Sequence, residues 1–411
     1  MKIYHLSDLH FGKSIYGLSM LDDQRYWVDQ FIKVCKEDKP DAIVIAGDVY
    51  DRASPSGDAV ELLDYMLTKL AEMEISVMMI AGNHDSGQRL SFGHSLLSKQ
   101  KIHIAGTVRK ELDHVTLEDA FGPVTFWLLP YTYPDQVIQI LRDEDIHTYD
   151  QALRRLIEEQ PIDRTLRNVI ISHQNVTANG IEIERGGSET MVGGVGQVDY
   201  TAYDDFEYAA LGHIHSAYSV GRKEVRFNGT PICYHMNETR QELKGYTEVV
   251  LNAKGEEVEI RQVGIDPLHK MRYLRGTKEG VYELLEDDRG REEYIGITII
   301  DERITPEINN YLKQLLTSRG SILMELLSTY SAFSGESASA EKEAVETKSL
   351  EDLFADLYVD QRGGIPPEDN EYALMQYAGE LVRNMDTHEP LPAETVTKMV
   401  ERALKIGGNT K

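Results

Sequence analysis

Short clusters of polar side chains follow five apolar runs of this sequence, and their residue types could bind metal ions. The clusters are Asp8-Leu9-His10, Gly47-Asp48-Val49-Tyr50-Asp51, Gly82-Asn83-His84-Asp85, Ser172-His173 and Gly212-His213-Ile214-His215. The runs before them are residues 3–6, 42–46, 77–81, 169–171 and 208–211. Each run has the length and the apolar character of a buried strand. Because ligands bind beyond the carboxyl ends of the strands in an open α/β sheet, we expect the clusters to form one site.

The clusters offer carboxylate, amide and imidazole groups, which are the donors that divalent first-row metals accept. Seven of these side chains are candidate ligands: Asp8, His10, Asp48, Asn83, His173, His213 and His215. Seven donors are too many for one catalytic ion that keeps an open position. Two ions that share a carboxylate account for them, and Asp48 is the best bridge because it lies on the central motif. Such a pair generates a nucleophile at neutral pH and stabilises the oxygens of a phosphoester.

His84 lies between Asn83 and Asp85, next to a candidate ligand, but is not needed as a ligand in addition to the seven candidates. We therefore expect His84 to donate a proton to the leaving oxygen. Each cluster alone has an ordinary explanation, since Asn83 or Asp85 could cap a helix and the last cluster could be a turn. Five of the 13 histidines fall within the clusters, however, and together they favour a metal site.

The ordered set of clusters resembles that of the calcineurin-like metallophosphoesterase superfamily. Within it, several stretches look like those of the SbcD nuclease family: residues 2–13, 47–52, 80–86, 193–198, 210–215 and 228–232. The resemblance covers residues 1–265 closely and 266–330 loosely. It implies a manganese-dependent DNA nuclease subunit, both exonuclease and hairpin endonuclease, that processes double-strand ends in repair and recombination. Its partner would be an SMC-like ATPase of the SbcC type, and the subunit would be a homodimer within a heterotetramer.

The resemblance also implies how the ligands are shared between two Mn²⁺ ions, with Mg²⁺ as the alternative metal. One ion would be held by Asp8, His10, Asp48 and His215, and the other by Asp48, Asn83, His173 and His213. His84 would be the catalytic acid. Some relatives carry a second active-site histidine at the position of Asp51, so the resemblance leaves the role of Asp51 undefined.

The composition predicts a protein of several domains without membrane segments. Its 411 residues exceed the ~250–300 at which a single core stops growing, and 41% of them are hydrophobic. No apolar run approaches the ~20 residues needed to cross a bilayer, and the sequence enters a strand directly after Met1. The two cysteines, Cys35 and Cys233, lie outside the clusters. We therefore expect a cytoplasmic protein in a reducing compartment.

The formal net charge of −26 is unusual for a protein that meets a polyanion, since autonomous nucleic-acid binders have basic surfaces. Residues 334–358 contribute seven carboxylates against two lysines. Two divalent ions would add positive charge at the site, and a partner subunit could supply DNA affinity. Charge alone argues against DNA as the substrate, but the motifs outweigh it.

Apolar spacing predicts an α/β fold. Helical spacing covers residues 22–36, 55–73 and 149–158, and further strands are expected at 124–129, 218–220, 225–228, 246–251 and 258–263. We expect a two-sheet metallophosphoesterase sandwich flanked by helices, with the metal site at the shared edge of the sheets. The Gly-rich stretch 186–196 is expected to be a loop, beside which Arg185 could meet a phosphate.

Four regions are expected along the chain. Residues 1–265 would form the nuclease domain, and residues 266–330, with a second strand–helix pattern after Pro267, a small α/β capping domain. Residues 331–349 would be an acidic linker. Residues 350–411 would hold two helices, 370–385 and 393–406, with apolar stripes. Because so short a pair has little core of its own, we expect it to dock onto the partner ATPase, the alternative being a pair folded back on the cap.

Three other functions share part of this pattern. A stand-alone phosphodiesterase acting on nucleotides or small phosphoesters would have the same five clusters. A metal-binding scaffold without turnover is disfavoured by His84 beside a full ligand set. A protein phosphatase is disfavoured by the cap-like module and the tethered helices.

Overall fold

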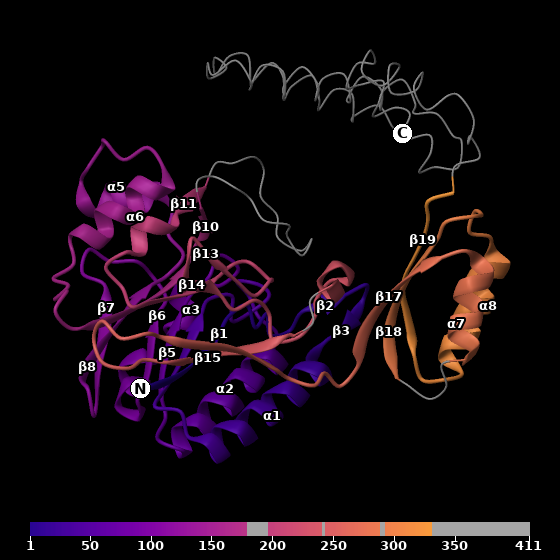
Figure 1. Cartoon of the computed structure of the whole chain (residues 1–411), viewed down its shortest axis with the longest axis horizontal. Coiled ribbons are helices and arrows are strands. Elements are labelled where there is room, and N and C mark those ends of the chain that lie inside the picture. The colour runs from indigo at the N-terminus through magenta and orange to yellow at the C-terminus, as the bar shows by residue number, and fades with distance from the viewer. Residues whose placement is uncertain (179–195, 241–242, 288–291, 331–411) are drawn as a thin grey trace, which may run out of the picture. The chain divides into compact units, whose positions relative to one another are not determined.

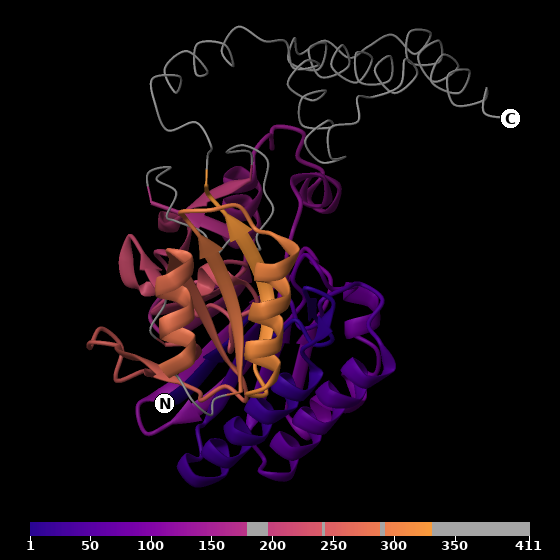
Figure 2. The same ribbon diagram turned by 90° about the vertical axis from the view of Figure 1, so that its right-hand side faces the viewer.

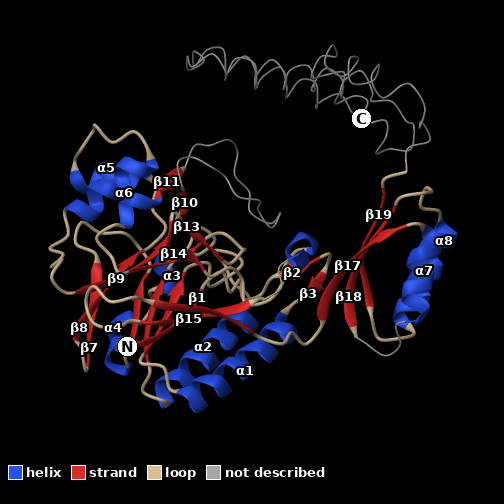
Figure 3. Ribbon diagram, in the orientation of Figure 1, coloured by secondary structure: helices blue, strands red, loops and turns tan. Residues whose placement is uncertain are grey.

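The computed structural model describes residues 1–178, 196–240, 243–287 and 292–330. Residues Met1–Thr329 form one compact unit, dominated by two six-stranded sheets (Figures 1 and 3). The first sheet has, in spatial order, β16 (Glu259–Gly264), β15 (Gly245–Val250), β1 (Lys2–Leu6), β4 (Ala42–Ala46), β5 (Ser76–Ile80) and β6 (Ile102–Ala105). The second has β13 (Tyr218–Val220), β14 (Arg222–Phe227), β12 (Tyr208–Gly212), β9 (Arg167–His173), β8 (Gly122–Leu129) and β7 (Asp113–Asp119).

The central strands are buried on both faces, which is why their sequences are apolar runs instead of alternating patterns. Every residue of β4, β5, β9 and β12 is buried. In the first sheet β1, β4 and β5 run parallel, and in the second β8, β9 and β12 do. Parallel sheets are covered on both faces. Between the two sheets lies an apolar layer that includes Val44 and Met78 from the first and Phe126, Ile171 and Tyr208 from the second.

Helices cover the outer faces of both sheets. α1 (Leu21–Asp38) and α2 (Gly57–Glu72) lie side by side along the first sheet (Figure 1). Helix α2 begins where the Ser56 hydroxyl accepts a hydrogen bond from the Ala59 amide. Its apolar face packs into the same core as α1. α5 (Pro134–Leu141) and α6 (Tyr149–Glu158) pack against the second sheet. The expected two-sheet sandwich flanked by helices is confirmed.

Some elements were not predicted. Strand β7 is at the edge of its sheet and alternates exposed with half-buried residues, so its sequence lacks an apolar run. Strand β6 has only four residues. Helix α5 is short and begins at Pro134, a residue that favours the first turn of a helix but also marks loops. Sequence patterns therefore located the buried centre of the fold and missed its margins.

A third sheet follows Pro267, in agreement with the predicted second strand–helix pattern. β17 (Lys270–Gly276), β18 (Glu293–Ile299) and β19 (Ile322–Ser328) pair in parallel. α7 (Lys278–Asp287) and α8 (Pro306–Thr317) lie together on one face of this sheet (Figure 2). Ile297 from the sheet and Leu312 from α8 belong to a separate small core.

Buried polar contacts connect the third sheet to α1. The Asp23 carboxylate, only 2% exposed, accepts hydrogen bonds from the Tyr294 hydroxyl at 2.7 Å and from the His269 backbone amide at 3.1 Å. The His269 ring nitrogen Nδ1 lies 3.1 Å from the same carboxylate. Since leaving a buried carboxylate without partners is costly, these contacts specify where β17 and β18 meet the helix.

Several predictions fall outside the described residues. They concern the loop 186–196 with Arg185, the linker 331–349, the helices 370–385 and 393–406 and the docking region 350–411. Among the helices that the structure does describe, none combines the length and the apolar character needed to span a bilayer.

We expect Asp119→Asn to lower the free energy of unfolding by about 2 kcal/mol, within the range for a hydrogen bond to a charged group. The Arg167 guanidinium, 2% exposed, donates to the two Asp119 oxygens at 2.5 and 3.1 Å. The carbonyls of Gly122 and Asn252 also accept from Arg167 and would limit the loss. Urea denaturation at neutral pH measures the change.

The stabilisation should depend on pH. Hydrogen bonds from Arg167 lower the pKa of Asp119, so this carboxyl stabilises the fold above its unfolded pKa of about 4. This contribution is lost as the pH falls from about 4 toward the folded pKa. The free energies of unfolding of the wild type and the Asp119→Asn variant should therefore approach each other over that range. The exposed Arg164–Asp205 pair is the control, because Asp205→Asn should leave the urea midpoint nearly unchanged. Equal losses in the two variants would contradict this assignment.

Candidate metal centre

The five predicted clusters meet at one end of the two sheets. Three of them follow β1, β4 and β5 of the first sheet, and two lie at the ends of β9 and β12 of the second. They carry the seven candidate ligands Asp8, His10, Asp48, Asn83, His173, His213 and His215. Six of these seven residues are buried, and Asn83 is exposed at the rim.

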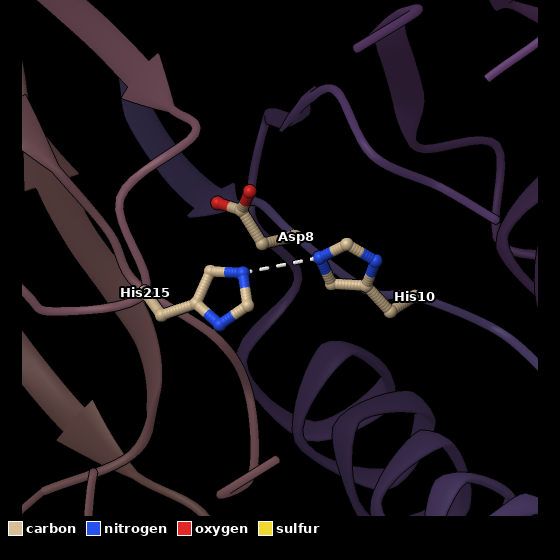
Figure 4. A group of neighbouring side chains, drawn as sticks. All are labelled: Asp8, His10 and His215. Carbon is tan, nitrogen blue, oxygen red and sulfur yellow. Dashed lines mark hydrogen bonds between the residues drawn. The ribbon is translucent and has the colours of Figure 1, made fainter. Parts of the chain in front are cut away.

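One group consists of Asp8, His10 and His215, in which the two histidine rings face each other and the Asp8 carboxylate lies beside them (Figure 4). One potential ligand atom from each lies within 4.8 Å of the others. Nε2 of His10 is 3.1 Å from Nε2 of His215. Two ring nitrogens that face each other beside a buried carboxylate form a donor set suited to a divalent cation.

A second group lies next to the first and contains Asp48, Asn83, His173 and His213. The side-chain oxygen of Asn83 is 3.1 Å from Nε2 of His173 and 3.1 Å from Nδ1 of His213. Nε2 of His173 is also 3.4 Å from the Oδ2 atom of Asp48. The structure thus brings together the four side chains for which the family resemblance implies a second ion.

Two carboxylates lie between the groups. The Asp48 oxygen Oδ2, which is 3.4 Å from His173 in one group, is 3.8 Å from Nε2 of His10 in the other. Asp8 belongs to the first group and also has an oxygen within 4.8 Å of Asp48 and His173. Asp48 therefore lies where a bridging ligand is needed, and Asp8 is a second carboxylate within reach of both groups.

Hydrogen bonds from the backbone orient these side chains. Nδ1 of His173 is 2.7 Å from the Ala46 carbonyl, so this nitrogen carries the proton and leaves Nε2 free to accept. The His84 amide donates to Oδ1 of Asp48 at 2.9 Å, which leaves Oδ2 for a metal. The His213 amide donates to Asp8 at 3.0 Å. The ligand atoms are thus held in place from the side opposite the centre.

The backbone is strained at four of the candidate ligands. Asp8, His10, Asp48 and His213 have φ angles of 52°, 45°, 48° and 97°. Positive φ is uncommon in residues other than glycine, and each such residue costs of order 1–3 kcal/mol. Strain of this kind persists only where the surrounding structure over-determines it, and its concentration here marks the loops as a functional centre.

Glycines permit the close approach of the loops. A Cβ atom on Gly82 would lie 2.1 Å from Oδ1 of Asp48, and one on Gly212 would lie 1.9 Å from the Ala46 carbonyl oxygen. A Cβ on Gly47 would lie 2.4 Å from Nδ1 of His173, and Gly47 also has a φ of +83°. Larger residues at these positions would displace ligands.

Burial and neighbouring charges shift the pKa values of the candidate ligands in different directions. Burial raises the pKa of Asp8 to about 6. Burial disfavours the Asp48 carboxylate as well, but the neighbouring His173 outweighs it and holds the pKa of Asp48 below its usual range. In the same way Asp48 outweighs burial and raises the pKa of His173 to about 9. Burial lowers the pKa of His10.

His84 lies beside the first group and is half-buried. Its Nδ1 atom is 2.9 Å from the Asp51 carbonyl, and its ring meets that of His10 edge-on with centroids 4.9 Å apart. The Asp51 carboxylate accepts from Nζ of Lys13 at 2.7 Å and lies 3.7 Å from Nδ1 of His10. With Nδ1 engaged, Nε2 is the His84 nitrogen available for proton transfer. Asp51 therefore lies directly beside His10 and His84, with Lys13 as the cation that pairs with its carboxylate.

Two acidic residues of the site had no role assigned from the sequence. The Asp85 carboxylate accepts from the backbone amides of Val49, Tyr50 and Gly82 at 2.9–3.0 Å and so ties two ligand loops together. Glu238, which is 1% exposed, lies 3.1 Å from Nδ1 of His215. Asp85 stood in a predicted cluster, but no local pattern pointed to Glu238.

The calcineurin-like phosphoesterase family matches residues 1–217, more than half of the chain and all the candidate ligands. The chain belongs to the calcineurin-like phosphoesterase family. It is a hydrolase of phosphoester bonds, and the resemblance noted in the sequence is confirmed.

This calcineurin-like phosphoesterase also has a longer match among curated proteins. It is 31% identical over 318 residues to the SbcD subunit of the nuclease SbcCD from Staphylococcus saprophyticus, a match that spans 77% of this chain and 82% of the relative. Among solved structures, TT1561 of Thermus thermophilus is similar with a TM-score of 0.37 and 11% identity, over 64% of this chain and 98% of that one. The 31% identity over 77% of the chain makes it a member of the SbcD family.

The side chains of this calcineurin-like phosphoesterase fit a dinuclear metal centre, on which the family depends. Facing nitrogens of His10 and His215 and the converging donors around Asn83 form two adjacent sets. Two buried carboxylates shared by these sets need a positive charge nearby. Divalent cations supply that charge and accept these oxygen and nitrogen donors.

We expect Gly212→Ala to weaken metal binding and to destabilise the phosphoesterase by about 1–3 kcal/mol, as overpacking does. The added Cβ would meet both the Ala46 carbonyl and, at 2.7 Å, Nδ1 of His173, whose mutual hydrogen bond orients the ring. Gly57→Ala is the control, because no atom lies within 4 Å of a Cβ there. Calorimetric metal titration and thermal unfolding give the two readouts. Unchanged metal affinity in the Gly212 variant would show that the ring tolerates displacement.

Proposed function

We propose that this protein is a manganese-dependent DNA nuclease subunit, with exonuclease and hairpin endonuclease activity, that processes double-strand ends with an SMC-like ATPase. The observation that carries the proposal is the convergence of seven ligand side chains with His84 beside them. The relative from Staphylococcus saprophyticus, named as part of the nuclease SbcCD, supports the choice of DNA and of an SbcC-type partner. We place the protein in the cytoplasm.

The proposed ligand sets follow the two groups. Asp8, His10, Asp48 and His215 would hold one ion, and Asp48, Asn83, His173 and His213 the other. When bound, two divalent ions generate a nucleophile at neutral pH and stabilise the charge on the phosphate. Asp48 would hold both ions, since its Oδ2 faces His10 and His173. His84 protonates the leaving oxygen through Nε2, because Nδ1 is held by the Asp51 carbonyl.

Substrate class separates this proposal from its main alternative, a phosphodiesterase of nucleotides or small phosphoesters. Purified protein with Mn²⁺ should cleave hairpin and blunt-ended DNA and leave cyclic nucleotides intact. Bis-p-nitrophenyl phosphate serves as the positive control, because both kinds of enzyme hydrolyse it. Cleavage of cyclic nucleotides without action on DNA would refute the nuclease proposal. The same assay with Mg²⁺ in place of Mn²⁺ tests the metal.

We also propose four regions: a nuclease domain (1–265), a capping domain (266–330), an acidic linker (331–349) and a docking region for the ATPase (350–411). Support for the first boundary comes from the separate sheet and core of β17, β18 and β19. A net charge of −26 makes a DNA-binding partner useful, since phosphate contacts supply most non-specific affinity.

Truncation after Tyr330 should leave two metal ions bound and the cleavage of a short single-stranded substrate at nearly the full rate. The shortened protein should fail to co-purify with an SbcC-type ATPase, and ATP should no longer stimulate its action on duplex ends. Removal of the acidic residues 334–358 alone should strengthen DNA binding at low salt, because like charges repel within about a Debye length. A stable complex between the truncated protein and the ATPase would instead place the docking surface within residues 1–330.

Two large, exposed apolar side chains support the proposal that the protein is a homodimer. Phe92 is 87% exposed and Leu96 is 70% exposed, at or beside α4 (His94–Leu97). Apolar side chains of this size that face solvent mark interaction surfaces. Light scattering should show a dimer for the wild type and a monomer for the Phe92→Ser, Leu96→Ser double variant. A dimer that survives both changes would place the interface elsewhere.

A further inference from the structure

A buried ion pair lies behind the first ligand group, outside all five clusters. Glu238 lies in η3 (Met236–Arg240), a short 3₁₀ helix, and its side chain is inaccessible to solvent. Its oxygen Oε2 accepts hydrogen bonds from Nζ of Lys244 at 2.8 Å, from the Thr230 hydroxyl at 3.0 Å and from the Tyr234 amide at 3.2 Å. The other oxygen, Oε1, is 3.1 Å from Nδ1 of His215. A carboxylate fixed by so many partners holds one geometry.

The contact with Glu238 determines which nitrogen of His215 faces the centre. A carboxylate accepts hydrogen bonds, so Nδ1 of His215 carries the proton and donates it to Oε1. Nε2 then carries the lone pair that can bind a cation, and it is the atom that faces Nε2 of His10. Hydrogen-bond partners of this kind fix the tautomer and the ring orientation of metal-binding histidines.

Lys244 holds both ends of this arrangement. Besides Glu238, its Nζ atom donates to the His215 carbonyl at 2.7 Å and to the Thr230 hydroxyl at 2.8 Å. Its side chain is 9% exposed, and the residue lines a cavity of about 450 Å³ beside Asp23 and Tyr294. Lys244 therefore fixes the backbone of His215 directly and its ring through Glu238. It also supplies the positive charge that a buried carboxylate requires.

The second ligand group is oriented differently. His173 is held by the backbone carbonyl of Ala46, which no substitution of a side chain removes. The ring nitrogen Nδ1 of His215, by contrast, contacts the carboxylate of Glu238, a side chain outside the predicted clusters. Loss of Glu238 should therefore affect the two groups unequally.

We propose that Glu238 and Lys244 are positioning residues that orient His215 and thereby set the affinity of one of the two metal positions, that of Asp8, His10 and His215. The inference rests on the two-ion centre of the proposed function. It assigns no chemical step to Glu238, which touches no substrate, and it explains why a buried ion pair is retained beside the centre.

The test is calorimetric titration of the full chain with Mn²⁺, after the wild type has been shown to bind two ions. Glu238→Ala should bind one ion about 10–100-fold more weakly and the other unchanged, as expected when a ligand loses its hydrogen-bond partner. The phosphodiesterase rate should recover as Mn²⁺ is raised, because the substitution changes metal affinity and leaves the loaded centre intact. Glu238→Asp should restore part of the affinity. Glu248→Gln, at a half-buried position of β15 where the side chain pairs with Arg261, is the control for loss of one negative charge.

A double variant separates positioning from folding. Lys244→Met leaves Glu238 without its cation and should lower the melting temperature, whereas Glu238→Gln with Lys244→Met removes both charges and should recover much of that loss. Affinity at the weakened position should recover only in part, because a glutamine oxygen accepts a weaker hydrogen bond from Nδ1 of His215 than a carboxylate does. If stability and affinity both return to the wild-type level, the ion pair acts only on folding and the proposal is wrong. Equal weakening of both ions in Glu238→Ala, or of neither, also overturns it. A wild type that binds a single ion would instead overturn the two-ion centre itself.

Discussion

Replacing Asp48 with asparagine is expected to abolish the binding of both metal ions at micromolar concentrations. The Oδ2 atom of Asp48 is the only carboxylate oxygen found in ion-pair contact with histidines of both described groups, at 3.4 Å from His173 and 3.8 Å from His10. An amide has one oxygen and no charge, so it cannot neutralise two cations. The phosphodiesterase rate should fall by more than about 10²-fold, since even the loss of a ligand's hydrogen-bond partner costs 10–100-fold. Elemental analysis after gel filtration counts the ions.

Single-site variants are the controls for the bridge. His10→Ala should weaken one position and His173→Ala the other, each leaving a detectable ion. Asp8→Asn is the sharpest comparison, because Asp8 also lies within reach of both groups. If Asp8→Asn loses both ions and Asp48→Asn loses one, the bridge is Asp8. A single ion in the saturated wild type would refute the pair altogether.

The clustering of the candidate ligands could be predicted from the sequence because each of them follows a local pattern. A strand buried on both faces has an apolar sequence, so the first polar residues after it are easily recognised, as with Asp48 after β4. Parallel neighbours then bring the ends of β1, β4 and β5 together. The helical apolar spacing predicted for residues 55–73 is equally local, and the structure has α2 there with Leu62, Leu63, Leu67 and Leu70 buried.

Other parts of the site depend on contacts between distant residues, which leave no local pattern. Glu238 meets His215 across 23 positions of sequence, and Asp23 meets Tyr294 across 271. The positive φ angles of Asp8 and Asp48 are also invisible in the sequence, because neither position carries the glycine that usually marks them. Edge strand β7 was missed because it faces solvent. The sequence therefore shows the candidate ligands but not the residues that support them.

His84→Ala is expected to keep both metal ions and the affinity for DNA while losing about 10²–10⁴-fold in rate, the contribution of a general acid. The contact of Nδ1 with the Asp51 carbonyl leaves Nε2 to carry the proton. The loss should depend on the leaving group. A nucleoside alkoxide needs that proton, whereas p-nitrophenolate departs without it, so hydrolysis of bis-p-nitrophenyl phosphate should suffer far less than DNA cleavage.

The leaving-group comparison distinguishes the acid from a metal ligand, the other role open to a ring that groups with His10 and Asp51. If His84 is the acid, His84→Ala should bind two ions and should slow DNA cleavage far more than hydrolysis of bis-p-nitrophenyl phosphate. If His84 is a metal ligand, His84→Ala should lose an ion and slow both reactions alike, because both need the metal. His147→Ala, at an exposed position before α6, should match the wild type in every measurement. Since proton donation and metal binding predict opposite outcomes for the same variant, equal slowing with a lost ion would transfer His84 to the ligand set and leave the proton donor to be sought elsewhere.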